Sequence, residues 1–271
     1  MYETYWQLDC RPFENDFDPR FYYPSDSHQS AMLKLRYVLE NGRGAAVLSG
    51  AGGLGKTHLI ECLARQMRES CSPFAKVVFP QLPADQLVAY LADELWNEVA
   101  PADIPTHQHV RRIEKAIQRA DQHRKQPVVV IDEAHLLDHA SLETVRLLLN
   151  LGYDSPAGLT LILVGQPALL PTLDRLPELD DRLNVKCLLR RFAVDESVAY
   201  MTHRMKVAGA RRSVFTDEAL EAVHHLTHGN PRHINRLCDL ALLVGFAEEL
   251  RTLGPDQIAA VTDELVAVSP E

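Results

Sequence analysis

Cysteine is scarce in this sequence, and basic residues are outnumbered by acidic ones. The number of cysteines is odd and none stands in a C-x-x-C pair; they are Cys10, Cys62, Cys71, Cys187 and Cys238. This argues against a disulfide framework or a zinc knuckle and favours free thiols in a reducing compartment. The 28 Lys and Arg residues against 37 Asp and Glu leave a formal charge of −9. That balance disfavours a dedicated nucleic-acid binder.

Long apolar runs are also missing. The longest stretch, from Leu237 to Phe246, is interrupted by Asp239 and Gly245, and it falls well short of the roughly 20 residues that cross a bilayer. The first twenty residues are acidic and aromatic, without the basic region and apolar core of a signal peptide. We therefore expect no transmembrane segment in this chain, and we expect a cytoplasmic protein.

Apolar and β-branched runs alternate with helical patterns over the first 191 residues. We expect strands at 45–48, 75–79, 128–131, 159–164 and 185–189, with helices at 27–41, 57–67, 84–98, 107–124 and 141–151. This alternation predicts an α/β fold with a parallel five-stranded sheet flanked by helices. After residue 191 only helical patterns follow, at 194–207, 216–227, 231–249 and 255–266. We therefore predict an aromatic lead-in at 1–25 that packs on the core, an α/β domain at 26–192, and a small all-helical lid domain at 193–271.

A glycine-rich segment follows the first predicted strand and opens a helix. It reads Gly50-Ala51-Gly52-Gly53-Leu54-Gly55-Lys56-Thr57 and fits the phosphate-loop pattern G-x-x-x-x-G-K-[ST]. Its glycines let successive backbone N–H groups turn toward an anion, and the helix start adds its positive end. Lys56 then reaches the β- and γ-phosphates and the Thr57 hydroxyl ligates Mg²⁺. We predict that residues 50–57 and the adjoining His58 hold ATP.

Two acids end the third predicted strand. The run Val128-Val129-Val130-Ile131 leads into Asp132 and Glu133, at the end of a parallel sheet where ligands bind. We assign Asp132 to Mg²⁺, together with Thr57, and Glu133 to the activation of water for attack on the γ-phosphate. A base at Glu133 favours hydrolysis over passive nucleotide binding.

With both motifs placed, the chain resembles the AAA+ ATPases, a P-loop α/β domain followed by a helical lid. It is most similar to the ATPase domain of the general secretion pathway protein A family and the related transposition-helper ATPases. The segments that carry this resemblance are Arg11-Pro12-Phe13, Asp18 to Tyr23, the phosphate loop, Val130 to His135, Leu163-Val164-Gly165-Gln166-Pro167 and Gly229-Asn230-Pro231-Arg232.

The resemblance implies further site residues. Gln166 stands where AAA+ proteins carry a polar sensor of the γ-phosphate, and Arg232 where a lid arginine reaches that phosphate. Arg182 stands where an arginine finger is presented to the neighbouring subunit, with Arg175, Arg190 and Arg191 as competitors for this role. Each position has a simpler alternative: an ordinary turn at Gln166, a helix-surface arginine at Arg232 and a surface arginine at Arg182. Adenine contacts from Phe13, Tyr22 or Tyr23 compete with plain core packing.

The resemblance also implies partners. We expect an ATPase that uses ATP and Mg²⁺, forms homo-oligomers when ATP is bound, and passes its movement to a protein partner in secretion or envelope assembly, such as a membrane component. Two alternatives stay open: a DNA-associated regulator like the transposition helpers, and a nucleotide-gated switch that hydrolyses ATP only slowly.

Overall fold

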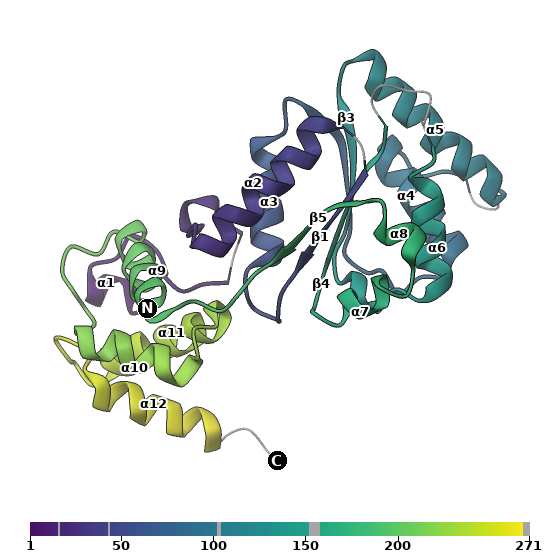
Figure 1. Ribbon diagram of the computed structural model, residues 1–271. Helices are drawn as coiled ribbons and strands as arrows, with labels where there is room; N and C mark the ends of the chain where they lie inside the picture. The colour runs from purple at the N-terminus through teal and green to yellow at the C-terminus, as the bar shows by residue number, and fades with distance from the viewer. Residues whose placement is uncertain (16, 43, 102–103, 152–157, 268–271) are drawn as a thin grey trace. The chain divides into compact units, whose positions relative to one another are not determined.

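A parallel sheet of five strands is the framework of the middle of the chain, in a computed structural model that describes residues 1–15, 17–42, 44–101, 104–151 and 158–267 (Figure 1). Its strands are β1 (Gly44–Ser49), β2 (Cys71–Val77), β3 (Gln126–Ile131), β4 (Thr160–Gly165) and β5 (Leu183–Leu188). Their spatial order is β2-β3-β4-β1-β5, and each adjacent pair is parallel. The carboxyl ends of the strands therefore share one edge of the sheet.

Helices cover both faces of this sheet. The helices are α2 (Asp26–Asn41) and α3 (Lys56–Gln66) on one face, and α4 (Ala84–Trp96), α5 (Thr106–Gln122) and α6 (His139–Leu148) on the other (Figure 1). Strands β3 and β4 are buried along their whole length and consist mainly of Val, Ile and Leu, as is typical of central strands in a parallel sheet. The predicted α/β fold with five parallel strands is confirmed.

The second strand differs from its predicted position. We expected it at 75–79, but β2 runs from Cys71 to Val77, and Val78 and Phe79 lie beyond it with 61 % of each side chain exposed. The pairing of β2 with β3 ends at Val77 and Ile131, because Asp132 then turns out of the sheet. The apolar run of the sequence continues past the last residue that has a neighbouring strand.

Short helices between β3 and β5 were not predicted either. They are η2 (Ala134–Leu136), α7 (Leu169–Leu173) and α8 (Pro177–Asp180). Each is shorter than two helical turns, so no helical periodicity of apolar residues marks it in the sequence. They carry the chain away from the carboxyl edge of the sheet after β3 and β4.

The remainder of the described chain after β5 is helical, as expected. It consists of α9 (Val194–Val207), α10 (Asp217–Thr227), α11 (Pro231–Ala247) and α12 (Pro255–Ala267). Helix α10 is capped by Thr216, whose side chain accepts a hydrogen bond from Ala219 N, and α11 by Asn230, with Pro231 in its first turn. Among the described residues, none of the helices has both the length and the apolar content that a membrane crossing requires.

The described chain divides into two compact units. One contains residues 26–52 and 59–189, and the other contains residues 1–25, 53–58 and the chain from residue 190 onward. The boundary therefore passes through the glycine-rich loop, between Gly52 and Gly53. The three-part division at 1–25, 26–192 and 193–271 remains a proposal, and its last residues, 268–271, lie outside the described part of the chain.

The N-terminal segment belongs to the same unit as the C-terminal helices. It contains α1 (Glu3–Trp6) and η1 (Pro19–Phe21), two short helices that we did not predict. Its buried aromatic side chains lie in one hydrophobic cluster with side chains of α9, α10 and α11, rather than in the cluster that lies on the sheet; they are Tyr2, Trp6, Phe13 and Phe21.

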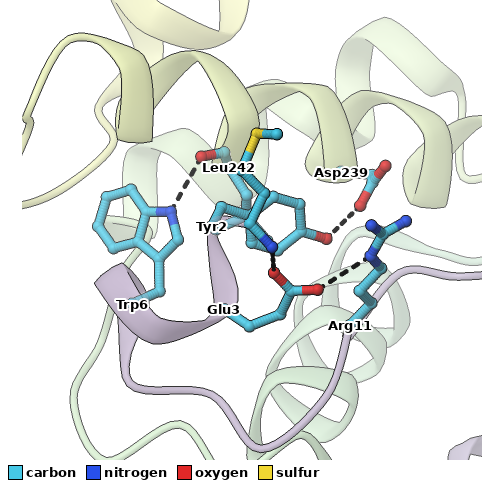
Figure 2. A network of polar contacts seen from close by, with 7 residues as sticks. Tyr2, Glu3, Trp6, Arg11, Asp239 and Leu242 are labelled. Atoms are coloured by element: carbon cyan, nitrogen blue, oxygen red, sulfur yellow. Dashed lines mark hydrogen bonds and ion pairs between the residues drawn. The ribbon is translucent and has the colours of Figure 1, made fainter.

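Polar contacts fasten this segment to α11. The Tyr2 hydroxyl donates a hydrogen bond to the Asp239 carboxylate, and the Trp6 indole N–H donates to the Leu242 carbonyl at 2.9 Å (Figure 2). Within the segment, Arg11 Nε donates to Glu3 at 3.0 Å (Figure 2). Burial and the neighbouring Asp239 carboxylate raise the pKa of Tyr2 far above its usual value, so this phenol remains a donor at all ordinary pH values.

Candidate nucleotide-binding site

The glycine-rich loop joins the end of β1 to the start of α3. Gly50 N donates a hydrogen bond to Gly165 O at 3.2 Å, which ties the first residue of the loop to the end of β4. Gly53 and Gly55 have φ angles of +80° and +82°, in the left-handed region that glycine adopts without steric cost. Lys56 begins α3. Backbone N–H groups of such a loop, followed by a helix N-terminus, suit an anion such as a phosphate group.

The three residues after the last loop glycine begin the helix. Lys56 is buried, with 6 % of its surface exposed, although its side chain carries a charge. Thr57 and His58 are half-buried. The rings of Phe17 and Tyr22 meet the His58 ring edge-on, with centroids 6.3 and 5.5 Å away. Of the aromatic residues considered for adenine, Tyr22 is therefore the one that lies against the phosphate-loop segment.

The other two aromatic candidates lie in the hydrophobic cluster of the C-terminal helices. Phe13 is 2 % exposed and meets Phe215 edge-on at 6.1 Å. The Tyr23 ring lies 5.8 Å from Phe192 and 5.9 Å from Tyr200. Their contacts are those of core packing, the alternative that the sequence left open.

The acid pair lies directly after β3. Asp132 is 7 % exposed, its N–H donates to Val77 O at 2.8 Å, and its Oδ1 accepts from Glu133 N at 2.9 Å. Glu133 has φ +52° and ψ +33°, a left-handed conformation that costs a residue with a side chain about 1–3 kcal/mol. Such strain is concentrated at functional sites, where the surrounding structure holds it. The Glu133 side chain is 44 % exposed.

His135, for which we predicted no role, contacts both Glu133 and Gln166. Its Nδ1 lies 3.4 Å from Glu133 Oε2 and 3.4 Å from the backbone N–H of Gln166. The two contacts need different states of Nδ1, since it accepts from Gln166 when unprotonated and donates to Glu133 when protonated. Its sequence signals were its position two residues after Glu133 and its place in the segment from Val130 to His135 that carries the family resemblance. Gln166 follows the last residue of β4 and is exposed.

Arg232 lies against the glycine-rich loop through its backbone. Its N–H donates to Gly53 O at 3.3 Å, and also to the Asn230 side chain at 3.1 Å. A β-carbon on Gly53 would lie 2.7 Å from Asn230 Oδ1 and 2.8 Å from Arg232 Cβ, distances that real β-carbons do not show. The absence of a side chain at Gly53 therefore permits the start of α11 to approach the loop. The predicted start of α11 at residue 231 is confirmed, and Asn230 caps it.

Arg182 lies at the amino ends of the parallel strands, whereas Gly50 lies at their carboxyl ends. Its carbonyl accepts from Ala45 N at 3.0 Å, near the start of β1, whereas Gly50 follows the end of that strand. Five residues at about 3.3 Å each separate these points by on the order of 16 Å. The structure therefore does not bring Arg182 to the loop of its own chain. Among its competitors, Arg190 forms an ion pair with Glu196 at 2.7 Å.

Comparisons with known proteins agree with this architecture. Residues 39–173 match the AAA domain family. General secretion pathway protein A from Aeromonas hydrophila is 31% identical over 273 residues, which cover 100% of this chain and 50% of that protein. The chain thus spans about half the length of this relative.

Solved structures show the same fold at low identity. The Aeropyrum pernix ORC2 protein, in ADPNP-ADP complexes, has a TM-score of 0.72 at 16% identity and covers 97% of this chain and 73% of its own. The Thermotoga maritima RuvB Holliday junction branch migration motor has a TM-score of 0.63 at 18% identity and covers 89% of this chain and 69% of its own. The chain is therefore an AAA-domain protein, distantly related over its whole length to general secretion pathway protein A.

Proposed function

We propose that this protein is a Mg²⁺-dependent ATPase that converts its nucleotide state into movement of its C-terminal helices and into subunit assembly. One observation carries the proposal. The phosphate-loop pattern follows β1 and the acid pair follows β3, and these strands flank β4, whose own end leads into Gln166. Three neighbouring strands thus deliver an anion-binding loop, two carboxylates and an amide to one edge of the sheet.

The residues around the phosphates suit this chemistry. Loop N–H groups and the Lys56 ammonium would bind the β- and γ-phosphates. A hydroxyl from Thr57 and a buried carboxylate from Asp132 are hard oxygen donors, the kind that Mg²⁺ prefers. When bound, Mg²⁺ would neutralise charge on the phosphate oxygens. Lys56 supplies the same neutralisation from the protein.

Glu133 would act as the general base toward water. Its backbone is left-handed, and its carboxylate and the Gln166 backbone N–H both lie 3.4 Å from the Nδ1 atom of His135. The Gln166 amide would orient the attacking water. In this scheme His135 is a positioning residue, because it acts through Glu133 and Gln166.

Arg232 would report the nucleotide state to the C-terminal helices. Its N–H already meets Gly53 O, so the start of α11 is coupled to the loop that would hold the phosphates. A guanidinium suits charge on γ-phosphate oxygens. Loss of that phosphate would remove one of the forces that hold α11 to the loop.

Arg182 would serve the site of a neighbouring subunit. Its place near the start of β1, at the edge remote from Gly50, leaves its own site without it. We infer that ATP-bound subunits assemble, and that hydrolysis is completed in trans. The relation to general secretion pathway protein A favours a protein partner in secretion or envelope assembly over a DNA target.

The test is steady-state ATP hydrolysis as a function of protein concentration, with and without duplex DNA. We expect specific activity to rise with concentration and to ignore DNA. Mixing Arg182→Ala with Glu133→Gln subunits should restore activity that neither variant has alone, because each would supply the part that the other lacks. Arg68→Ala is the matched control, since it removes an exposed arginine of the same unit that is no candidate for this role.

Other outcomes would replace the proposal. Stimulation by DNA would favour the DNA-associated regulator. ATP binding without hydrolysis at any concentration would favour a nucleotide-gated switch. No restoration in the mixture, with Arg182→Ala fully active alone, would remove Arg182 from the site.

A further inference from the structure

A groove follows helix α9 in the unit that contains the C-terminal helices. It consists of two adjoining cavities, of about 780 and 280 Å³, that share Thr202 and Lys206. The larger cavity runs along the seam of α9 and α10, and its apolar floor comes from Val194, Val198 and Ala199. The smaller has an apolar floor of Met201, Met205, Val214, Phe215 and Leu220. We call the two together the α9 groove.

The ends of the α9 groove carry opposite charges. Asp195 and Glu221 line the larger cavity, while Arg211 and Arg212 line the smaller. Lys206 stands where the cavities join. None of these five residues forms an ion pair with another described residue; the Arg212 guanidinium lies over the Trp6 ring at 5.9 Å from its centroid. Their charges are therefore available to a partner.

The dimensions favour a polypeptide over a small molecule. The larger cavity falls within the roughly 300–1,000 Å³ that small-molecule sites occupy, but the smaller one that adjoins it lies below that range and suits a single anchoring side chain. From Val194 to Lys206 the groove follows α9 for about 18 Å, at about 1.5 Å per residue. A helix of about twelve residues with apolar anchors at i, i+3, i+4 and i+7 covers such a length.

The charges favour a peptide over nucleic acid. A phosphate backbone would be attracted to Lys206 and the two arginines, but Asp195 and Glu221 would repel it at the other end, and the apolar floor would stay uncovered. An amphipathic helix with acids at one end and bases at the other satisfies both ends and the floor. Because such a helix can lie in either direction, the order of its charges along the sequence is not constrained.

We propose that the α9 groove is a docking site for an amphipathic helix of a protein partner, whose acidic end meets Lys206, Arg211 and Arg212 and whose basic end meets Asp195 and Glu221. The proposal deepens the function proposed above by giving the partner a place and a chemistry, and it rests on that function only in assuming a protein partner. Binding is measured without nucleotide, so its failure and a failure of ATP hydrolysis appear in separate assays.

The experiment selects peptides from a displayed library of random 15-residue sequences on the whole chain. Enriched peptides are synthesised with a fluorescein label, and their binding is followed by fluorescence anisotropy. The test variants are Ala199→Glu, which places a carboxylate on the exposed floor, and Arg211→Glu. The matched controls are Ala259→Glu and Arg251→Glu, which make the same changes at exposed positions outside the groove. Circular dichroism confirms that all four fold.

We expect enriched peptides with apolar residues at helical spacing and acids gathered at one end. Ala199→Glu and Arg211→Glu should each weaken their binding at least tenfold, and the controls less than twofold. The proposal is overturned if no peptide is enriched on the wild-type chain over Ala199→Glu. Equal loss in tests and controls would overturn it too, as would a labelled 20-base-pair duplex that binds and depends on Arg211 while no peptide does.

Discussion

The two adjacent glycines of the phosphate loop should respond very differently to the same substitution. Gly53 has φ +80°, and an added β-carbon would lie 2.7 Å from Asn230 Oδ1 and 2.8 Å from Arg232 Cβ. Gly52 has no such φ, and nothing lies within 4 Å of its added β-carbon. We therefore compare Gly53→Ala with Gly52→Ala in the absence of nucleotide, so that any loss reflects the protein alone.

The magnitude for Gly53→Ala has three parts. A left-handed alanine costs about 1–2 kcal/mol. Moving the start of α11 away from the loop weakens the hydrogen bond from Arg232 N to Gly53 O, worth about 0.5–1.5 kcal/mol. It also disturbs the cap at Asn230, worth about 1 kcal/mol. Allowing for partial relaxation, we expect a loss of about 2–4 kcal/mol, whereas Gly52→Ala should stay within about 0.5 kcal/mol of the wild type.

The assay is urea unfolding followed by tryptophan fluorescence in a Trp96→Phe background. The chain has two tryptophans, and the remaining one, Trp6, is fully buried in the hydrophobic cluster of the C-terminal helices. Its emission therefore reports the unit that contains Gly53. With a slope of about 2 kcal/mol per M of urea, the midpoint of Gly53→Ala should fall by about 1–2 M. Equal midpoints for the two variants would refute the close contact between loop and α11.

Three further predictions follow from strain and protonation. Glu133→Gly and Glu133→Ala should both abolish ATP hydrolysis, but the glycine variant should be more stable by about 1 kcal/mol in urea unfolding, because only glycine relieves the left-handed backbone; equal stabilities would contradict the strain. Desolvation lowers the pKa of His203 and His224 below the usual 6.5, so below that pH the unfolded chain binds more protons than the folded one, and stability should fall from pH 7.5 to 5.5. Replacing both histidines with Gln should flatten this slope, and an unchanged slope would assign it elsewhere. Burial raises the pKa of Cys187 to about 11, so at pH 8 iodoacetamide should label the half-exposed Cys10 and spare Cys187 until the chain unfolds, as mass spectrometry of the peptides would show.

Features that depend on local pattern were the most predictable from the sequence. The β-branched run before Asp132 identified β3, and the helical pattern at 231–249 identified α11, because strand composition and helical periodicity act over a few residues. The glycine spacing around Lys56 likewise identified the loop between β1 and α3. These predictions needed no knowledge of which distant segments meet.

Features that depend on distant contacts were not predictable. Nothing in the sequence near Trp6 indicates that its indole bonds the Leu242 carbonyl, 236 residues away. The contact of His135 with Gln166 joins the ends of two different strands, and the left-handed backbone of Glu133 is imposed by its surroundings. The position of Arg182 is a different case. A residue that precedes a parallel strand must lie at the amino edge of the sheet, so its distance from Gly50 could have been inferred from the predicted topology.

The two backbone attachments of the glycine-rich loop bear on how nucleotide binding would be communicated to α11. Its first residue is tied to the sheet through the hydrogen bond from Gly50 to Gly165, and its middle is tied to α11 through the bond from Arg232 to Gly53. A phosphate group that draws the loop N–H groups inward must therefore load both attachments at once. Glycine at 52, 53 and 55 lets the backbone between them change its angles at little cost. Gly53→Ala, which obstructs the second attachment, should therefore weaken the response of α11 to ATP more than it weakens ATP binding.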